Sequence, residues 1–547
     1  MIEVKVPIIP GKKPGIVGKI DINVGEKVKK DQILCSIETA KGNRQIKASA
    51  DGYIKEILVE EGQEVTANEV LILLDEILQV KVEADVKTME KDLLVIGAGP
   101  GGYVAAIYAC KRGLDVVLAE KSKLGGTCLN MGCIPTKSLV QSAHCYNALK
   151  EMDLFGIEGD FHASVNIEKV LQRKNSVVDT LVSGIEYLID KNKIDCIEGK
   201  AEFINDKLVK VGDKRIQAKN IIIATGSVPD TLKVEGYDLD GVIDSTEALR
   251  LNKIPDTLLV IGGGVIGSEF AFIYNTFGSK VHIVEFQDRL LPMLDPDAGR
   301  EMERVCKEKN IHVSTSSKVV SIKETVEKKY VVSFEKNGKL YSSIAEKVLM
   351  STGRKANIDG LGLGNTSVKF NPQNGSIIVN EYKQTNVSNI YAIGDVSSGL
   401  KLAHLASHEA MAAVDHMLGE KREVKEIHVP SVVYTDPEIA VIGYSEQDLK
   451  NQNRKYKSCR FPFTANGKAL TMNQNKGVIK LLTSEKGEIL GAVICGPDAS
   501  SLIASITIAM KNNVSVTQLT HTVFAHPTTA EVIHEACLAL IDRGVHM

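Results

Sequence analysis

About the first 75 residues alternate short β-branched runs with glycines, a pattern typical of strands joined by tight turns. This pattern repeats without gaps at an offset of 37 residues. The aligned positions are Gly15, Val17, Ile20, Ile22, Gly25, Val28, Ile33 and Leu34 in the first copy, and Gly52, Ile54, Ile57, Val59, Gly62, Val65, Val70 and Leu71 in the second. Two such copies predict a small two-fold β-sandwich or flattened barrel.

Residues 76–91 follow this module and carry mixed charge without Gly or Pro. This composition predicts a linker that is partly helical and has a short reach, unlike the freely swinging Ala/Pro-rich type.

A longer repeat, at an offset of 165 residues, begins with an apolar run and a glycine turn. Its copies are residues 93–120, LLVIGAGPGGYVAAIYACKRGLDVVLAE, and residues 258–285, LLVIGGGVIGSEFAFIYNTFGSKVHIVE. In each copy a helical stretch, a second apolar run and a glutamate follow the turn. Each copy therefore predicts a βαβ unit.

The glycine turns of both copies have the spacing of a dinucleotide site. The glycines are Gly97, Gly99 and Gly102 in the first copy, and Gly262, Gly264 and Gly267 in the second. They let the backbone approach a pyrophosphate at the helix N-terminus, and Glu120 and Glu285 can accept hydrogen bonds from ribose hydroxyls. Because Glu285 would repel a 2′-phosphate, NAD is favoured over NADP. Two units predict two dinucleotides, a flavin and a nicotinamide.

Two further segments support the flavin site. Thr225, Gly226 and Ser227 follow the predicted strand 221–223, and Asp395 follows the predicted strand that begins at Ile390. A carboxylate at the end of that strand can bind ribityl hydroxyls.

Composition narrows the function classes. Hydrophobic residues make up 44% and charged residues 25% of the 547 residues, which excludes disordered and fibrous proteins. With 66 Lys+Arg against 69 Asp+Glu, the net charge of -3 provides no basic field for nucleic acid or an acidic membrane surface. No apolar run reaches the ~18 residues of a membrane span, and no secretion signal opens the chain. We therefore expect a cytoplasmic protein.

Two cysteines shortly after Glu120 are the strongest candidates for chemistry. They lie in the segment GGTCLNMGCIPTK, residues 125–137, as Cys128 and Cys133. One irregular helical turn could bring them within disulfide reach, and Pro135 suits the first turn of a helix whose dipole would favour a thiolate at Cys133. No metal site is predicted, because no second Cys pair or clustered His lies nearby. The other eight cysteines are interpreted as core residues: Cys35, Cys110, Cys145, Cys196, Cys306, Cys459, Cys495 and Cys537.

This segment resembles the redox-active disulfide of the flavoprotein disulfide reductases, most closely that of the dihydrolipoamide dehydrogenases. The resemblance implies that Cys128 exchanges with the dithiol, that Cys133 forms the charge-transfer thiolate, and that Lys137 pairs with Glu269. It implies FAD contacts at Gly97, Gly99, Gly102, Glu120, Lys121, Gly126, Thr127, Cys128, Lys137, Ala201, Thr225, Gly226, Ser227, Asp395, Leu402, Ala403 and His404. The NAD contacts implied are Gly262, Gly264, Val265, Ile266, Gly267, Glu269, Glu285 and Gly353.

A candidate base lies near the C-terminus, at His526. Pro527 is expected to start a helix, and Glu531 can fix the imidazole tautomer and raise its basicity. The block resembles the His-Pro-Thr motif of the same family, in which the dyad reaches the disulfide from the partner subunit of a homodimer. One departure is Phe524, where family members often have a second His.

The N-terminal repeat resembles the lipoyl domains of 2-oxo-acid dehydrogenase complexes, with Lys41 as the attachment site. The turn here is Ala40-Lys41-Gly42 rather than the usual Asp-Lys-Ala. Biotin carriers usually flank their lysine with methionines, and none is present, so lipoyl is favoured over biotin.

Together these features predict an α/β chain with two Rossmann-like dinucleotide-binding domains and a C-terminal α+β dimerisation domain, preceded by a small all-β lipoyl-type domain. The expected boundaries are 1–75 for the lipoyl domain, 76–91 for the linker, 92–236 for the FAD domain, 237–360 for the NAD domain, 361–428 for a return to the FAD domain, and 429–547 for the dimerisation domain.

The expected function is NAD-dependent dihydrolipoyl oxidation by a homodimer. Its expected partners are the dihydrolipoyl domains of acyltransferases or of H-protein. Two alternatives remain open at this point. One is another flavin disulfide reductase, of the glutathione or mercuric type. The other is a subunit that serves mainly as a lipoyl carrier and scaffold. The resemblance implies a component of a 2-oxo-acid dehydrogenase, an acetoin or a glycine-cleavage complex.

Overall fold

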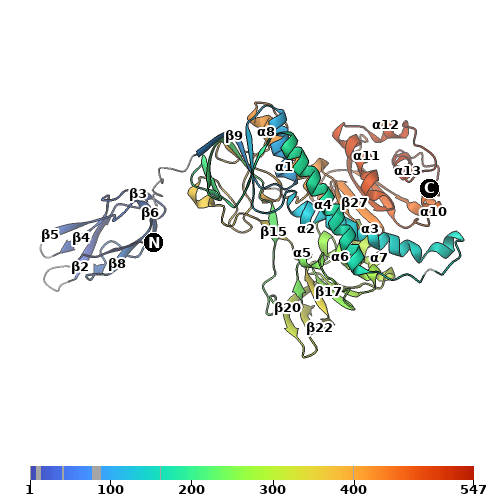
Figure 1. Cartoon of the computed structure of the whole chain (residues 1–547), viewed down its shortest axis with the longest axis horizontal. Coiled ribbons are helices and arrows are strands. Elements are labelled where there is room, and N and C mark those ends of the chain that lie inside the picture. The colour runs from blue at the N-terminus through green and yellow to red at the C-terminus, as the bar shows by residue number, and fades with distance from the viewer. Residues whose placement is uncertain are drawn as a thin grey trace. The chain divides into compact units, whose positions relative to one another are not determined.

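A computed structural model describes residues 2–7, 14–39, 42–76, 88–160, 162–397 and 399–546. The chain divides into two compact units, Met1–Val86 and Lys87–Met547, which are described separately (Figure 1). No helix in these ranges is both long enough and apolar enough to cross a membrane.

The N-terminal unit consists of two four-stranded sheets, with strand orders β1-β8-β6-β3 and β5-β4-β2-β7. Its strands are β1 (Ile2–Lys5), β2 (Gly15–Ile20), β3 (Lys27–Val28), β4 (Ile33–Thr39), β5 (Gly42–Lys47), β6 (Gly52–Ile57), β7 (Glu64–Val65) and β8 (Val70–Glu76). Strands β2, β3 and β4 recur 37 residues later as β6, β7 and β8. Alternate residues such as Val17, Ile37 and Ile54 are buried between the sheets, so the predicted two-fold β-sandwich is confirmed. Lys41 lies outside the described residues.

The predicted linker is shorter than expected at its C-terminal end. Residues 77–87 lie outside the described part of the chain, and Thr88 already begins β9. The last four residues of the expected linker, 88–91, are therefore strand rather than helix.

The first dinucleotide-binding domain is built on a sheet of order β11-β10-β9-β14-β13-β12, with β25 pairing beside β14. Its elements are β9 (Thr88–Ile96), α1 (Pro100–Lys111), β10 (Val116–Glu120), α4 (Ile167–Lys191), β11 (Asp195–Glu198), β12 (Ala201–Phe203), β13 (Leu208–Val211), β14 (Lys214–Ile223), β25 (Ile390–Ala392) and α8 (Ala403–Met417). Strands β9, β10, β11, β14 and β25 are parallel, and β12 and β13 are antiparallel. The strand β25, from a segment after the second dinucleotide-binding domain, thus joins the sheet of the first.

The second dinucleotide-binding domain has a five-stranded parallel sheet of order β16-β23-β17-β18-β19. Its elements are β16 (Val242–Ile243), α5 (Ser245–Ala248), β17 (Thr257–Ile261), α6 (Val265–Phe277), β18 (Lys280–Val284), α7 (Pro296–Glu308), β19 (His312–Ser314) and β23 (Lys347–Met350). An antiparallel sheet of β20 (Ser317–Glu324), β21 (Tyr330–Lys336) and β22 (Lys339–Ala345) packs beside it, and the short pair β15 (Ser227–Pro229) and β24 (Arg354–Ala356) lies between the two domains in sequence.

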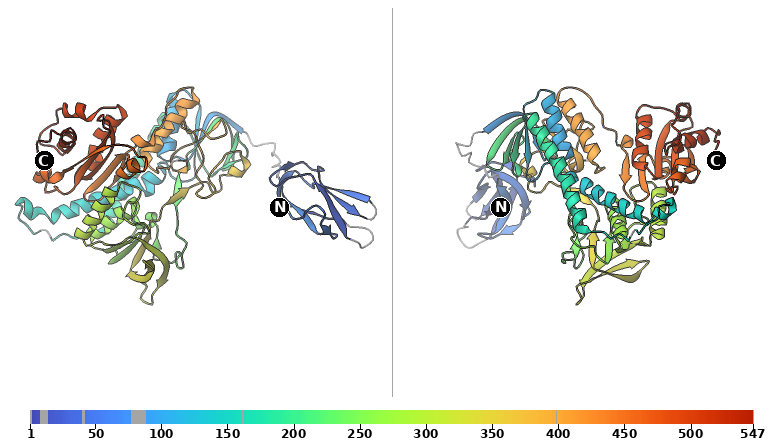
Figure 2. Two further views of the ribbon diagram at one scale, coloured as in Figure 1. Left: turned by 180° about the vertical axis from the view of Figure 1, so that it is seen from behind. Right: turned by 45° about the vertical axis from the view of Figure 1, so that its right-hand side comes forward.

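The C-terminal domain has a five-stranded antiparallel sheet of order β26-β27-β30-β29-β28. Its elements are β26 (Ser431–Val433), β27 (Glu438–Gly443), α9 (Glu446–Asn451), β28 (Lys457–Pro462), α10 (Gly467–Thr471), β29 (Val478–Thr483), β30 (Ile489–Gly496), α11 (Ala499–Lys511), α12 (Val516–Thr520) and α13 (Glu531–Leu540). Phe461, Ile494, Ile503 and Val532 are buried where α11 and α13 cover the sheet (Figure 2).

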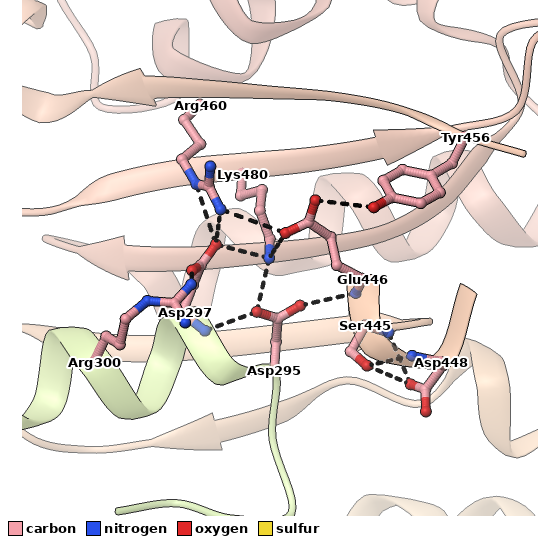
Figure 3. A network of polar contacts seen from close by, with 9 residues as sticks. All are labelled: Asp295, Asp297, Arg300, Ser445, Glu446, Asp448, Tyr456, Arg460 and Lys480. Carbon is pink, nitrogen blue, oxygen red and sulfur yellow. Dashed lines mark hydrogen bonds and ion pairs between the residues drawn. The ribbon is translucent and has the colours of Figure 1, made fainter. Parts of the chain in front are cut away.

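A buried ion network joins this C-terminal domain to α7. Lys480 is 1% exposed, and its Nζ lies 2.7 Å from both Asp295 Oδ1 and Asp297 Oδ2 (Figure 3). Arg460 contacts Asp297 at 2.6 Å, and Glu446 lies 3.4 Å from Lys480. Because a buried cation is costly unless it is paired, this network fixes how the two domains meet.

Candidate active site

The cysteine pair lies where two helices meet. Cys128 is on α2 (Gly126–Met131), and Cys133 is the first residue of α3 (Cys133–Leu149), with Gly132 between them. Both residues are free thiols in the structure. Pro135 lies in the first turn of α3, as the sequence predicts, and no side chain caps that helix. Cys133 therefore lies at a helix N-terminus, where the dipole favours a negative charge.

The two thiols contact each other and have opposite electrostatic environments. A hydrogen bond with Cys128 lowers the pKa of Cys133 to about 7, against the effect of desolvation and with the help of the Lys137 charge. The same hydrogen bond, followed by burial, raises the pKa of Cys128. Of the pair, Cys133 is therefore the sulfur that carries a negative charge near neutral pH.

An ion pair between the two dinucleotide-binding domains lies beside the cysteine pair, with Glu269 as the residue from the second domain. Lys137, one turn along α3 from Cys133, places Nζ 2.9 Å and 3.0 Å from the two carboxylate oxygens of Glu269 on α6. The ion pair implied by the resemblance is thus present, and Glu269 is nearly buried. Tyr434 contacts both partners: its backbone N–H donates to Glu269 Oε1 at 3.0 Å, and its ring centroid lies 4.4 Å from Lys137 Nζ.

The first glycine turn leaves an open helix end. Gly99 caps α1 without a side-chain hydrogen bond. A Cβ at Gly102 would lie 1.7 Å from the carbonyl oxygen of Gly97, so no other residue fits there. Glu120 accepts a hydrogen bond from the Ala98 N–H at 2.7 Å, which places its carboxylate beside the turn.

A cavity of about 450 Å³ opens beside Glu120. The segment that contains Ala201 lies near this carboxylate as well, because the Gly199 N–H donates to the carbonyl oxygen of Glu120 at 2.8 Å. Lys121 follows Glu120 and is exposed.

The second glycine turn repeats this geometry. Gly264 caps α6 without a side-chain hydrogen bond, and a Cβ at Gly267 would lie 2.0 Å from the carbonyl oxygen of Gly262. The buried Glu285 accepts from the Gly263 N–H at 2.5 Å. Gly353 lies close to this turn, since Ser351, two residues before it, donates to the carbonyl oxygen of Gly262.

Residues expected around the flavin converge from several strands. The buried Oγ1 of Thr225 has no hydrogen-bond partner among the described residues. Ser227 Oγ donates to Asp395 Oδ2 at 2.6 Å and accepts from Arg354 Nε at 2.7 Å. Leu402, Ala403 and His404 form the N-terminus of α8, where no side chain caps the helix.

A flavin dinucleotide and a nicotinamide dinucleotide fit these residues. Each turn offers uncapped helix N–H groups for a pyrophosphate and a carboxylate for a ribose. On the flavin side, the orphaned Thr225 hydroxyl is a further polar atom in need of a partner.

The base candidate forms a hydrogen-bonded pair. His526 Nδ1 lies 2.9 Å from Glu531 Oε1, and the Thr528 N–H donates to Glu531 Oε2 at 2.9 Å. Although burial acts to raise the pKa of Glu531, these two hydrogen bonds lower it below its usual value. The prediction that Pro527 starts a helix is wrong: α13 begins at Glu531, and Pro527 lies in the turn before it.

The base pair and the cysteine pair lie on different parts of the chain. Among the described residues, no hydrogen bond or ion pair connects His526 to either cysteine, and the His526 side chain is 78% exposed. Phe524, which replaces the second His, packs against the C-terminal core with its ring centroid 5.5 Å from that of His534.

The interpretation of the remaining cysteines is partly wrong. Five are buried as expected: Cys35, Cys306, Cys459, Cys495 and Cys537. Cys110 is half-buried, and Cys145 and Cys196 are exposed, because they fall on the outer faces of α3 and β11. No group of three or more His, Cys, Asp or Glu side chains in the described ranges is arranged to hold a metal ion.

Two residues that contact the site were not among the candidates. Arg354 directly follows the candidate Gly353, and its pKa is lowered by burial despite the opposing charge of Asp395. Tyr434 directly follows β26 and lies far in sequence from every candidate residue. Neither has a periodicity or a spacing that places it at the site from sequence alone.

Comparisons with known proteins cover both units. A family model described as "Pyridine nucleotide-disulphide oxidoreductase" matches residues 91–410, and the model of its dimerisation domain matches residues 429–537. A model described as "Biotin-requiring enzyme" matches residues 3–74.

Similar proteins include two dihydrolipoyl dehydrogenases. One from Bacillus subtilis (strain 168) is 40% identical over 460 residues, which cover 83% of this chain and 99% of that protein. The one from Staphylococcus aureus is 38% identical over 464 residues, covering 84% and 98%.

Solved structures are similar over the same span. LpdA from Mycobacterium tuberculosis has a TM-score of 0.76 at 25% identity and covers 83% of this chain and 100% of its own. The HOCl-induced flavoprotein disulfide reductase RclA from Escherichia coli has a TM-score of 0.72 at 28% identity, covering 82% and 99%.

Proposed function

The chain belongs to the pyridine nucleotide-disulphide oxidoreductase family, and from this premise we propose which of its residues carry out dihydrolipoyl oxidation. Its activity is that of an NAD-dependent dihydrolipoyl dehydrogenase, with FAD and NAD(H) as cofactors. The relatives favour this function over glutathione or mercuric reduction and over a purely carrier role. One observation carries the assignment of residues: the Cys128 and Cys133 thiols contact each other beside Lys137 at the start of α3.

The first half of the reaction is a dithiol–disulfide exchange. His526 removes a proton from one dihydrolipoyl thiol, because an alkyl thiol is no more acidic than cysteine, with its unperturbed pKa of about 8.5, and forms little thiolate at neutral pH. The substrate thiolate attacks Cys128 in the oxidised pair, the Cys128–Cys133 bond breaks, and Cys133 leaves as a thiolate. The second substrate thiol then loses its proton and attacks the mixed disulfide. This step closes the lipoyl disulfide and releases Cys128, so the cysteine pair has gained two electrons.

Cys133 is suited to be the leaving sulfur because its pKa is already low. A low-pKa thiol leaves faster, and Lys137 stabilises the charge that forms on it. A bound FAD would supply the acceptor for this electron pair and the hydride donor to NAD. Gly97, Gly99, Gly102 and Glu120 would hold the flavin dinucleotide.

The nicotinamide dinucleotide would be held at the second turn. The N-terminus of α6, from Gly264 to Gly267, would receive its pyrophosphate, and Glu285 would receive its adenosine ribose. Because the Glu285 carboxylate is buried beside the turn, a 2′-phosphate would meet an unscreened negative charge, which favours NAD over NADP.

The base acts across the subunit interface of a homodimer. The chain has a dimerisation domain at residues 429–537, and the exposed His526 side chain lies within it. We assign the His526–Glu531 dyad to the active site of the partner subunit, where Glu531 holds the imidazole with Nε2 facing the substrate thiol.

The N-terminal domain extends the proposal to lipoyl transfer. Lys41 is the proposed attachment site, and the partners are dihydrolipoyl domains of acyltransferases or of H-protein. We place the protein in the cytoplasm, where thiols are kept reduced and a dithiol substrate can be supplied. Intact-mass measurement of the chain from its native host should show a lipoyl adduct that Lys41→Arg removes. An unmodified wild-type chain would argue against Lys41.

The cysteine assignment is tested with Cys133→Ser and the matched control Cys145→Ser on the same helix. Cys133→Ser should keep its flavin absorbance but lose dihydrolipoamide oxidation by about a thousandfold or more, because the exchange then has no leaving thiolate. Cys145→Ser should match wild type in both respects, since Cys145 is exposed away from the pair. Substantial turnover by Cys133→Ser would reject the assignment.

A further inference from the structure

Tyr434 occupies the point where three parts of the molecule meet. It follows β26 of the C-terminal domain and contacts Lys137 on α3 of the first dinucleotide-binding domain and Glu269 on α6 of the second. Its side chain is half-buried and packs against the core cluster that contains Phe270 and Val433. The proposed mechanism assigns it no part.

The two contacts of Tyr434 act on the two partners of one ion pair. The backbone N–H donates to Glu269 Oε1 at 3.0 Å, so this nearly buried carboxylate accepts from both Tyr434 and Lys137. The ring face lies 4.4 Å from Lys137 Nζ, within the range of a cation–π attraction. The Lys137 ammonium is thus held between a carboxylate and an aromatic face.

We propose that Tyr434 is a positioning residue, which holds the Lys137–Glu269 pair where the Lys137 charge acts on Cys133. The proposal rests on the proposed role of Cys133 as the thiolate of the redox pair. In this proposal the C-terminal domain, which carries His526, also acts on Cys133. It does so through the Tyr434 ring on Lys137 and the Tyr434 backbone N–H on Glu269.

The groups that face Cys133 come from several elements. They are Cys128 on α2, Lys137 on α3, Glu269 on α6, Arg354 on β24 and Tyr434 after β26. Lys137 lowers the pKa of Cys133, and Glu269 raises it. The net field at the sulfur therefore depends on where Lys137 Nζ lies, and a lysine that loses the ring contact has only Glu269 to hold it.

Tyr434→Leu and Tyr434→Phe separate the ring face from the rest of the residue. Both variants keep the backbone N–H. Phe also keeps the aromatic face, and it should be tolerated because the Tyr434 hydroxyl makes no hydrogen bond among the described residues. The readouts are the pH midpoint of the long-wavelength thiolate–flavin absorbance in the two-electron-reduced holoenzyme, and the pH dependence of Cys133 alkylation by iodoacetamide.

Tyr434→Leu should raise both midpoints by about half a pH unit, because Lys137 without the ring contact is held by Glu269 alone and stabilises the Cys133 thiolate less. Tyr434→Phe should stay at the wild-type midpoint. Equal midpoints in wild type and Tyr434→Leu would overturn the proposal, and so would an equal shift in Tyr434→Phe, because the hydroxyl would then be responsible.

Tyr434→Met is the second variant without an aromatic face, chosen because its flexible side chain refills the space. Loss of flavin from both the Leu and Met variants, with Phe intact, would show that the ring is needed for packing and would also overturn the proposal. If the proposed function itself fails, wild type will have no long-wavelength absorbance at all, an outcome distinct from an unshifted midpoint.

Discussion

The two βαβ units, residues 93–120 and 258–285, share one turn geometry and differ in what their helices carry. In both units no side chain caps the helix, and one glycine of the turn has no space for a Cβ atom. In both, a glutamate side chain accepts a hydrogen bond from a backbone N–H of the turn. At the position where α6 carries Glu269, α1 carries Val104, 165 residues earlier. Val104 packs into the apolar core, whereas Glu269 binds Lys137 beside the cysteine pair.

This difference shows how one unit serves two purposes. The turn offers the N–H groups and the carboxylate that a dinucleotide requires, and both copies keep it. A single substitution on the helix face lets the second copy also support the charge at Cys133. The first copy instead precedes that cysteine pair along the chain, and its helix packs against α8 through the bond from Tyr108 to Asp415.

The largest expected effect comes from placing a methyl group in each turn. Gly102→Ala should lose FAD and all activity, because its Cβ would lie 1.7 Å from the Gly97 carbonyl oxygen. Gly267→Ala, with a Cβ 2.0 Å from the Gly262 carbonyl oxygen, should keep FAD and its reduction by dihydrolipoamide but lose turnover with NAD. Flavin absorbance and anaerobic single-turnover reduction distinguish the two.

The matched control for these variants is Gly184→Ala on α4, where a Cβ meets nothing within 4 Å. It should behave as wild type. If Gly267→Ala released FAD as readily as Gly102→Ala, the two turns would not serve separate dinucleotides.

A smaller effect is expected from the buried ion network that joins α7 of the second dinucleotide-binding domain to the C-terminal domain. Lys480→Met should lower the free energy of unfolding by about 3–5 kcal/mol, because it leaves the buried Asp295 carboxylate without its cation. Lys476→Met, which removes an exposed pair with Glu308, should cost about 1 kcal/mol or less. Denaturant unfolding of both variants measures the difference, and similar losses would show that the buried network does not anchor α7.

The smallest effect concerns the Lys137 cation, which Glu269 of the second βαβ unit holds beside the cysteines. Lys137→Met should raise the pKa of Cys133 from about 7 by about one unit, because a cation that lowers this pKa is lost and Glu269, which raises it, is left behind. Iodoacetamide alkylation of Cys133 at neutral pH should slow accordingly. Lys150→Met, at the far end of α3, should leave the alkylation rate unchanged, and an unchanged rate in Lys137→Met would remove Lys137 from the account.

Features with a local signal could be predicted from the sequence. The 37-residue and 165-residue repeats identify the sandwich and the two βαβ units because each copy must satisfy the same backbone constraints. The helix from Cys133 follows from Pro135, whose fixed φ suits a first turn. The His526–Glu531 contact was accessible because both residues lie within one short segment.

The features that were missed depend on contacts between distant segments. Tyr434 reaches Lys137 across about 300 residues of chain, and no spacing encodes that approach. The exposure of Cys145 and Cys196 depends on which face of α3 and β11 the neighbouring elements leave open. The helix start at Glu531 was misplaced because a proline suits a turn as well as a first helical turn.

The central claim is that Cys133 becomes a thiolate beside the flavin when a dithiol reduces the pair. Anaerobic titration of the holoenzyme with dihydrolipoamide tests it most directly. The account predicts a long-wavelength absorbance band that is complete at two electrons per subunit and absent in Cys133→Ser. Bleaching of the flavin at two electrons without that band would contradict it.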